Sequence, residues 1–374
     1  MQYLFELGRI PELSRAEIEH VFLALNISYT IKVFEKNILI VEIPNTIDAN
    51  QIMERLGGTI KIAEFISTDT SVESIGNYLS ETQEGKIQFS LTGNNAKDVG
   101  LQVKKYLKEL GRSVRYIEAK NTATILHNNL VEKNGDITMT KYGTFVTRDI
   151  QPIEEWGERD FGRPGRDSRS GMLPPKLARI MINLTATDTQ GTILDPFCGS
   201  GTILTEAMSL GFAHIVGSDT SEKALDDTRK NIEWMKAQII DKKPATPKLI
   251  LSGAGELHGK ISPNTVDAIA AEPYMGKPLR GTEDRHILVK QAAELKELYV
   301  NAFKAFHKIL KPDASIVFII PRFLNKQEWI RIDCLERIQD LGFSLERLTD
   351  TEPSILYSRP GQFVGREIWK FKKI

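Results

Sequence analysis

The sequence contains few of the features that mark secreted, metal-binding or membrane-spanning proteins. Its 374 residues include only two cysteines, Cys198 and Cys334, so we expect no disulfide framework and a location in the reducing cytoplasm. No Cys/His spacing of a zinc site occurs, and no metal is predicted. The first residues lack the basic segment and apolar run of a signal peptide. No apolar stretch approaches the roughly 20 residues that cross a bilayer.

The chain also lacks an excess of either charge. It has 49 Lys and Arg residues and 49 Asp and Glu residues, so its formal net charge is zero. Proteins that bind nucleic acids are often basic as a whole because they neutralise phosphates, so any such surface here must be local. The length predicts two domains, since a domain usually has about 100–200 residues.

Residues 1–150 are predicted to form a mixed α and β region. Apolar runs predict strands at Tyr3–Leu7, Ile38–Ile43, Ile60–Ile66, Ile87–Leu91, Val114–Ile117, Ala123–His127, Asp136–Thr140 and Gly143–Thr147. Apolar residues at helical spacing predict helices at Ser14–Leu25, Ala49–Leu56 and Lys97–Leu110.

Residues 151–172 have few aliphatic side chains and several Gly, Pro and Arg residues, which predicts a linker with little regular structure. Its arginines are candidates for contacts with nucleic-acid phosphates: Arg159, Arg163, Arg166 and Arg169. Pairing with the acidic residues of the same stretch is an equally good interpretation.

Residues 173–374 alternate between strands and helices. The predicted strands are Thr192–Asp195, His214–Asp219, Lys248–Ser252, Val266–Ala271 and Ala314–Ile320, followed by a terminal hairpin of Ser344–Asp350 and Gly365–Phe371. A first helix is predicted to begin at Pro175. Four further helices are predicted at Gly201–Leu210, Ser221–Gln238, Asp284–Leu310 and Lys326–Leu341. Strands that are apolar on both faces, alternating with helices, predict a doubly wound α/β domain with a mostly parallel sheet.

The strongest motif is the loop Asp195-Pro196-Phe197-Cys198-Gly199-Ser200-Gly201-Thr202, which joins the first strand of this domain to a helix. Gly199 and Gly201 let a ligand approach the backbone, and the helix start offers N–H groups to a carboxylate. A dinucleotide loop would need glycine at position 204, where this chain has Leu204. A tight turn that binds nothing is the alternative interpretation.

Two further strand ends carry carboxylates. Asp219 ends the second strand about 20 residues past the glycine loop, where it can accept the ribose hydroxyls of a nucleoside or, alternatively, cap the next helix. Glu272-Pro273-Tyr274 ends the fourth strand, where the Tyr274 ring can stack on a planar base. Glu272 and the Pro273 carbonyl can then accept hydrogen bonds from an exocyclic amine. A packed strand-end turn is the plainer alternative.

Together, these motifs resemble the THUMP-domain tRNA guanosine N2-methyltransferases, and most closely the branch that acts on guanosine 10 of tRNA. The resemblance rests on Arg159-Asp160, Arg163-Pro164, Met172 to Ala178 and the loop from Asp195 to Gly201, and it extends to the opening from Leu7 to Ile18.

The resemblance implies an N-terminal ferredoxin-like segment with a THUMP module in residues 1–150 that binds tRNA. It also implies a Rossmann-like class I methyltransferase domain in residues 173–374, with a mostly parallel seven-stranded sheet. This domain would use S-adenosylmethionine as its cofactor. The cofactor-binding residues would be Pro174, Asp195, Pro196, Phe197, Gly199, Gly201, Thr202, Asp219 and Ala254. Glu272, Pro273 and Tyr274 would form the catalytic pocket for the base.

The sequence departs from this family at two positions. After the third strand, where the family often has an acidic residue for the adenine amine, this chain has Ser252-Gly253-Ala254-Gly255. The family usually has Asp-Pro-Pro-Tyr at the end of the catalytic strand, and this chain has Ala271-Glu272-Pro273-Tyr274. The alternatives are therefore a methyltransferase for another RNA or for DNA, or a non-catalytic RNA-binding protein with a degenerate methyltransferase fold. We expect a monomer, and the sequence does not decide whether a small activating protein subunit is required, as in some relatives.

Overall fold

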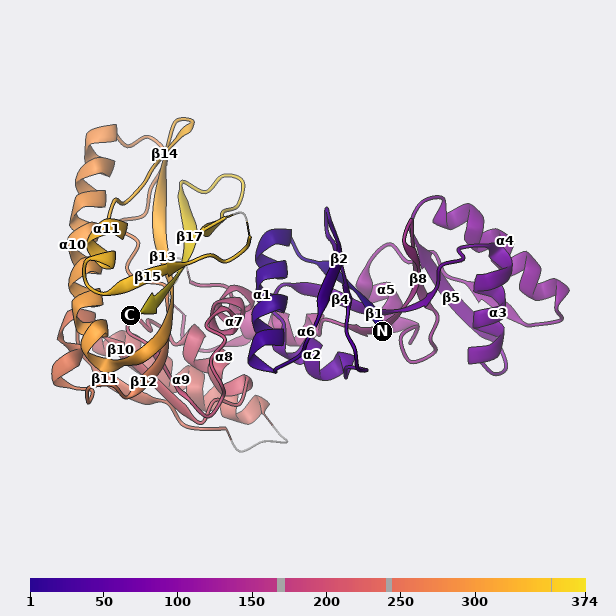
Figure 1. Cartoon of the computed structure of the whole chain (residues 1–374), viewed down its shortest axis with the longest axis horizontal. Coiled ribbons are helices and arrows are strands. Elements are labelled where there is room, and N and C mark those ends of the chain that lie inside the picture. The colour runs from indigo at the N-terminus through magenta and orange to yellow at the C-terminus, as the bar shows by residue number, and fades with distance from the viewer. Residues whose placement is uncertain (167–171, 240–243, 351) are drawn as a thin grey trace. The chain divides into compact units, whose positions relative to one another are not determined.

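The computed structural model describes residues 1–166, 172–239, 244–350 and 352–374, and it divides the chain into two units (Figure 1). The first unit contains residues 1–11 and 26–154. The second contains residues 12–25 and 155–374, and therefore includes a helix from the start of the chain.

The first unit is built on a sheet with the strand order β2-β3-β1-β4-β8-β7-β5-β6. Its strands are β1 (Gln2–Leu7), β2 (Thr30–Glu35), β3 (Ile38–Glu42), β4 (Thr59–Ser67), β5 (Ile87–Thr92), β6 (Val114–Tyr116), β7 (Asp136–Thr140) and β8 (Gly143–Ile150). Only β5 makes parallel pairs, with β6 and with β7. Its helices are α2 (Ala49–Arg55), α3 (Val72–Thr82), α4 (Ala96–Glu109) and α5 (Thr122–His127).

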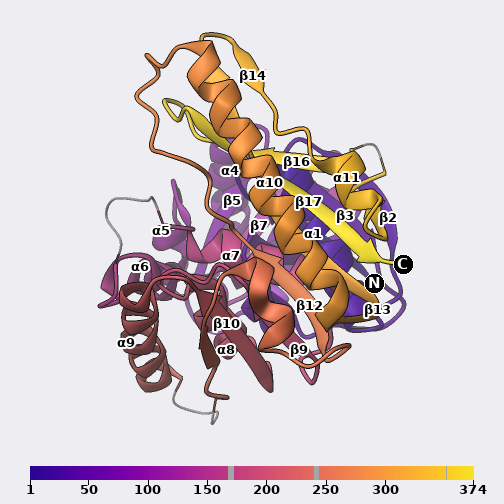
Figure 2. The same cartoon turned by 90° about the vertical axis from the view of Figure 1, so that its left-hand side faces the viewer.

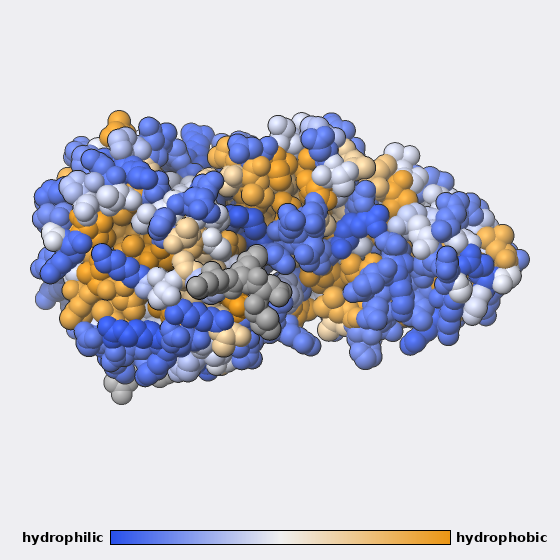
Figure 3. All heavy atoms as spheres, turned by 90° about the horizontal axis from the view of Figure 1, so that it is seen from below, coloured by the Kyte–Doolittle hydropathy of each residue, from blue (hydrophilic) through white to orange (hydrophobic). Residues whose placement is uncertain are grey.

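Helices α3 and α4 bury their apolar faces against β5 and β7, with Leu79, Leu107 and Phe89 fully buried in this core. The surface over these two helices that Figure 3 shows is mainly hydrophilic, as expected for amphipathic helices. In the sheet itself, the buried Asp136 accepts hydrogen bonds from Lys61 and from two hydroxyl groups, which offsets the cost of burying its charge.

The first unit differs from the prediction in one predicted strand and in two elements that were not predicted. Ala123–His127 was predicted as a strand and is helix α5, because the Asn121 side chain accepts a hydrogen bond from the Thr124 N–H and starts a helix there. The strand β2 and the helix α3 had no counterpart in the prediction.

The second unit contains a sheet with the strand path β11-β10-β9-β12-β13-β17-β15, with β14 beside β13 and β16 beside β17. Its strands are β9 (Thr192–Asp195), β10 (His214–Asp219), β11 (Lys248–Leu251), β12 (Val266–Ala271), β13 (Leu310–Asn325), β14 (Glu328–Ile330), β15 (Phe343–Glu346), β16 (Ser354–Tyr357) and β17 (Val364–Lys373). The strands from β11 to β13 are parallel, and β17 is antiparallel to both of its neighbours on the path. This confirms the predicted Rossmann-like sheet.

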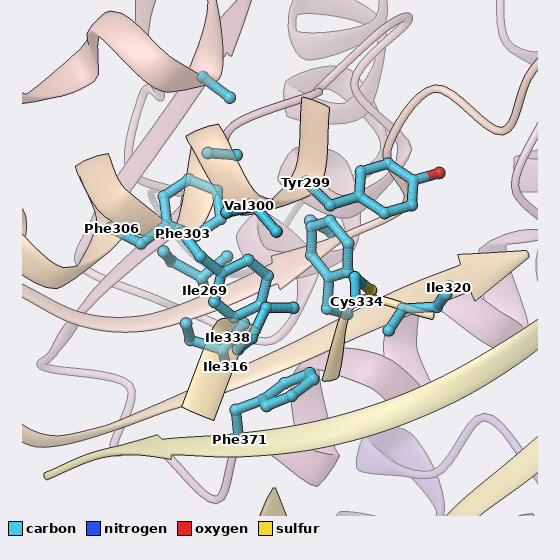
Figure 4. Packing of buried hydrophobic residues seen from close by; sticks show 14 of the residues in the cluster. Ile269, Tyr299, Val300, Phe303, Phe306, Ile316, Ile320, Cys334, Ile338 and Phe371 are labelled. Carbon is cyan, nitrogen blue, oxygen red and sulfur yellow. The ribbon is translucent and has the colours of Figure 1, made fainter. Parts of the chain in front are cut away.

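The helices of this unit are α1 (Pro11–Ala24), α7 (Pro175–Leu184), α8 (Thr202–Ser209), α9 (Glu222–Gln238), α10 (Arg285–Ile309) and α11 (Leu335–Gln339), with a 3₁₀ turn at Ala254–Gly259. Helix α10 lies across the sheet in front of β13 and β17 (Figure 2). Its residue Phe303 is the centre of the core in Figure 4, with ring centroids 5.2, 5.2 and 5.1 Å from those of Phe318, Phe343 and Phe371.

The segment Lys326–Leu341, predicted as one helix, is not a helix over most of its length. Strand β13 continues to Asn325, the chain turns at Lys326 with φ of 56°, and β14 then pairs back along β13. Only α11 remains helical. The turn at Pro360-Gly361 joins β16 to β17, so the predicted terminal hairpin has a different first strand, although β15 also pairs with β17.

The predicted linker contains regular structure before the residues that lie outside the description. Helix α6 (Ile153–Gly157) continues into a short π-helix at Glu158–Gly162. The burial of Trp156 explains this, because its ring lies under the Arg159 guanidinium, 4.1 Å away, and under that of Arg179, 4.9 Å away.

Helix α1 joins the second unit through polar contacts as well as apolar ones. Asn183 of α7 donates a 2.7 Å hydrogen bond to the fully buried Glu17 carboxylate, and Arg15 pairs with Asp350 at 2.8 Å. Burial and the nearby Lys370 lower the pKa of His20 on the same helix to about 4. The predicted boundary at residue 150 would separate this helix from the fold that it completes.

This arrangement predicts that Asn183→Ala destabilises the second unit, because it removes a donor from a buried charge. We expect a loss of about 1–3 kcal/mol in the free energy of unfolding, measured by urea titration of the full chain. Asn301→Ala, at an exposed position of α10, is the control and should change stability by less than about 0.5 kcal/mol. Equal losses in the two variants would show that the contact with α1 contributes nothing.

Candidate active site

Three carboxylates gather at the carboxyl edge of the parallel strands. Asp195 is the last residue of β9, Asp219 is the last residue of β10, and Glu272 directly follows β12. Strand β9 lies between β10 and β12, so this is the point where the strand order reverses, and ligands of open α/β sheets bind there. We refer to these three residues as the acidic edge.

Asp195 is the most deeply buried carboxylate of the acidic edge. Burial raises its pKa well above the ordinary value, and the charges of Asp219 and Glu272 raise it further. The backbone N–H of Phe197 donates to its carboxylate at 3.1 Å and acts in the opposite direction. An edge of this kind favours a cationic ligand and disfavours a pyrophosphate.

The glycine loop is held open by side chains of α9. Thr228 donates to the Gly199 carbonyl at 2.7 Å, and Asn231 donates to the Ser200 carbonyl at 2.8 Å. Gly199 and Gly201 have φ values of 53° and 82°. A Cβ at Gly201 would lie 2.8 Å from Thr228, whereas a Cβ at Gly199 would meet nothing within 4 Å. Gly201 is therefore needed for packing, and Gly199 borders open space where a ligand fits.

Asp219 joins the glycine loop to the start of α9. Its two carboxylate oxygens accept hydrogen bonds from the backbone N–H groups of Gly199, at 3.0 Å, and Ser221, at 2.8 Å. A carboxylate has about four acceptor positions, so both oxygens keep capacity for the hydroxyls of a ribose. The residue that caps α9 is Ser221, whose side chain accepts a hydrogen bond from the Ala224 N–H, so the alternative interpretation of Asp219 as the cap is wrong.

The Glu272-Pro273-Tyr274 turn presents three different groups. The Glu272 carboxylate is bonded to Arg366 of β17, with Oε1 2.5 Å from Nε. Burial raises the pKa of Glu272, although Arg366 acts to lower it. The Tyr274 side chain is 55% exposed, while its carbonyl accepts a 2.8 Å hydrogen bond from the buried Tyr299 hydroxyl. The ring is therefore free to stack while its backbone is held.

The other predicted cofactor residues lie around the same loop and strand ends. Pro174 precedes α7 as its N-cap residue, and the Pro196 carbonyl accepts a hydrogen bond from Ser218. Phe197 packs edge-on to Phe318, with centroids 6.2 Å apart. Thr202 is the first residue of α8, and Ala254 begins the 3₁₀ turn after β11.

The predicted phosphate-binding arginines do not form one surface. Arg159 is 8% exposed and contacts the buried Glu206 at 3.3 Å, and Arg163 is 4% exposed. Both are inside the second unit, where no phosphate backbone reaches them. Arg166 is exposed and donates to the Asp160 carbonyl at 3.1 Å, and Arg169 lies outside the described residues.

Arg163 is instead part of the glycine-loop region. Its Nη1 donates to the Thr202 hydroxyl at 2.5 Å, at the start of α8. Its Nε and Nη2 are buried and have no hydrogen-bond partner among the described residues. Buried donors of a cation next to the positive end of a helix suit a carboxylate ligand.

The chemistry of these residues fits S-adenosylmethionine. Arg163 and the start of α8 suit its carboxylate, the acidic edge suits its sulfonium and ammonium charges, and Asp219 suits its ribose. Among the described residues, no group of three His, Cys, Asp or Glu side chains is arranged to hold a metal ion. No helix within the described ranges is long and apolar enough to span a membrane.

Two residues of the site could not be found from the sequence. Arg366 lies 94 residues beyond Glu272, on β17, which is separated in the sheet from β12 by β13. Tyr299 belongs to the buried face of α10 and resembles any core aromatic. Both residues can be assigned to the site only when the order of the strands in the sheet is known.

Comparison with known families supports this chemistry. A model described as an RMKL-like methyltransferase domain matches residues 163–337, and one described as a DNA methylase matches residues 31–230, more than half of the chain. TrmN from Thermus thermophilus has a similar fold over 100% of both chains, with a TM-score of 0.54 at 19% identity. A possible methylase from Clostridium difficile covers 100% of this chain and 99% of its own, with a TM-score of 0.50 at 15% identity. The sheet order and these matches define an S-adenosylmethionine-dependent methyltransferase.

Two curated relatives are more specific. The tRNA (guanine(10)-N2)-dimethyltransferase of Pyrococcus abyssi is 26% identical over 327 residues, which cover 85% of this chain and 88% of the relative. The protein of the same name from Methanothermobacter thermautotrophicus is 31% identical over 161 residues, which cover 43% of this chain and only 42% of the relative. The chain belongs to the methyltransferases described by the model that matches more than half of it, and over most of its length it is similar to a relative named as a tRNA (guanine(10)-N2)-dimethyltransferase.

The raised pKa of Asp195 predicts that cofactor binding depends on pH. Its carboxyl group is protonated between the ordinary and the raised pKa, so a cationic ligand gains its full attraction only above the raised value. Below that value we expect the dissociation constant for S-adenosylmethionine, measured by calorimetry, to rise as the pH falls. Asp195→Asn should bind weakly and lack this part of the pH dependence. A wild-type pH dependence identical to that of Asp195→Asn would contradict this role.

Proposed function

We propose that this protein transfers a methyl group from S-adenosylmethionine to the exocyclic N2 amine of a guanosine in tRNA. The observation that carries the proposal is the Glu272-Pro273-Tyr274 turn, which brings acceptors and an exposed ring to the strand next to the glycine loop. The names of the relatives point to position 10 of tRNA.

The residues of the glycine loop and the acidic edge would hold the cofactor. Arg163 and the N–H groups at the start of α8 would receive its carboxylate, and Asp219 would receive its ribose. Ala254, at the start of the 3₁₀ turn, would lie along the adenine. When bound, the cofactor supplies a sulfonium methyl group that is already activated, so the protein contributes mainly position and electrostatics.

The Glu272-Pro273-Tyr274 turn would hold the target base. A guanine in a paired stem is out of reach, so it would be flipped out and stacked on the exposed Tyr274 ring. Glu272 and the Pro273 carbonyl would accept hydrogen bonds from the N2 amine and orient its lone pair toward the methyl group.

The same turn contains an acceptor for the proton that the N2 amine loses. The cofactor would supply the methyl carbon and would keep the electron pair of the broken carbon–sulfur bond, so the methylated N2 nitrogen would have one proton to lose. The amine proton passes to the Glu272 carboxylate, directly or through a water molecule. While it is ionised, a carboxylate whose pKa is raised by burial, as that of Glu272 is, is a stronger base than an exposed carboxylate.

A second candidate substrate is DNA, which the match to a DNA methylase model favours. The first unit, with its own sheet and helices, is the region that we expect to bind tRNA as a ferredoxin-like and THUMP module. We propose that the enzyme acts as a monomer in the cytoplasm, and that Arg166 contacts a phosphate of the tRNA. Purified protein that methylates tRNA only after a cell extract is added would show that an activating subunit is needed.

Replacement of the target amine tests the proposed substrate. Inosine lacks the N2 amine of guanosine, so an unmodified tRNA transcript with inosine at position 10 should accept no labelled methyl group. The same transcript with guanosine at that position should be labelled to completion. Equal labelling of the two transcripts would contradict the proposed position, and labelling of duplex DNA alone would favour the second candidate.

Two isosteric variants separate cofactor binding from methyl transfer. Asp219→Asn should weaken S-adenosylmethionine by about 10- to 100-fold in calorimetry, since a charged acceptor is lost. Glu272→Gln should keep the cofactor affinity within about twofold and lower the rate of methyl transfer by about 100-fold or more. A wild-type rate of methyl transfer in Glu272→Gln would show that the carboxylate has no role in the reaction.

A further inference from the structure

Strand β17 places two adjacent charged residues on opposite faces of the sheet. Arg366 is opposite Pro321 of β13 and bonds to Glu272, whereas Glu367 pairs with Arg322 on the other face. Successive side chains of a strand alternate between faces, so the two ion pairs are close in sequence but separate in space. Of these two ion pairs, only the pair of Arg366 and Glu272 includes a residue of the acidic edge.

The pair of Arg366 and Glu272 is shielded from water but is not closed to a ligand. The side chains are 8% and 13% exposed. Arg366 bonds to Oε1 of Glu272, and no described residue donates a hydrogen bond to Oε2. One oxygen is therefore held by the protein while the other remains able to accept a hydrogen bond from a ligand amine.

Glu272 needs such a partner for two physical reasons. A glutamate has one more rotatable bond than an aspartate, so an unrestrained carboxylate would lose its orientation. The carboxylate is also desolvated, and burial favours its neutral form, which cannot take up the proton of an amine. The guanidinium has a fixed geometry and a permanent charge, and it counters both effects.

We propose that Arg366 is the positioning residue that orients the Glu272 carboxylate and keeps it ionised for the target amine. The inference rests on the proposed function and extends it to a residue that touches neither the cofactor nor the base. Loss of the guanidinium should raise the pKa of Glu272, because Arg366 acts to lower it. The acid limb of the pH–rate profile should then move to higher pH.

The experiment compares Arg366→Gln, Arg366→Lys and Arg322→Gln with wild type. Single-turnover methyl transfer to tRNA is measured from pH 5.5 to pH 9 at saturating S-adenosylmethionine. We expect Arg366→Gln to move the acid limb upward by about one pH unit or more and to lower the rate at neutral pH by about 10- to 100-fold. Arg366→Lys should recover part of both losses, since it keeps the charge but not the fork of donors.

Arg322→Gln is the matched control. It breaks another close arginine–glutamate pair of β17, here with β13, so it should lower stability without moving the acid limb. A shift of the limb in this control as large as that in Arg366→Gln would overturn the proposal, because the effect would then come from damage to the sheet.

A second readout does not depend on catalysis. The pKa of Glu272, followed by carboxyl-carbon NMR with Glu272→Gln as the assignment control, should be higher in Arg366→Gln than in wild type. An unchanged pKa would overturn the proposal even if the activity falls. A raised pKa in a protein whose wild type methylates no RNA would support the electrostatic role of Arg366 and place the failure in the proposed function.

Discussion

The acidic edge is the constraint on which the rest of this site depends. Asp195, Asp219 and Glu272 end or follow three neighbouring parallel strands, and burial together with their mutual repulsion disfavours full ionisation. Such an edge favours positive charge close to it. Arg366 provides a permanent positive charge beside Glu272, and the edge suits the positive charge of a sulfonium cofactor. The charges that attract the cofactor and the charge that acts on the target amine therefore influence one another.

The positive charges of the site come from distant parts of the chain. Arg163 precedes α7, and Arg366 lies near the C-terminus. Helix α1, from the start of the chain, supports α7 through the buried contact of Glu17 with Asn183. The catalytic unit is therefore assembled from both ends of the sequence, and its first helix is part of the fold rather than of the preceding region.

The strands that carry the acidic edge were predictable from the sequence. Thr192–Asp195, His214–Asp219 and Val266–Ala271 have the predicted bounds, because apolar runs that end at an acidic residue or a proline mark buried parallel strands. The segment Lys326–Leu341 was not, since strand pairing with β13 overrides its helical spacing. The burial of Arg159 and Arg163 was not predictable either, because their partners Glu206 and Thr202 lie 47 and 39 residues away in the chain. Local patterns show which residues end a strand, but not which charges meet there.

The most direct test of the central claim is identification of the methylated nucleoside. Unmodified tRNA, ribosomal RNA and DNA would each be incubated with the protein and S-adenosylmethionine, digested to nucleosides and analysed by mass spectrometry. The account predicts N2-methylguanosine or its dimethyl form from tRNA alone. A methylated adenine or cytosine, or a product from DNA only, would contradict it.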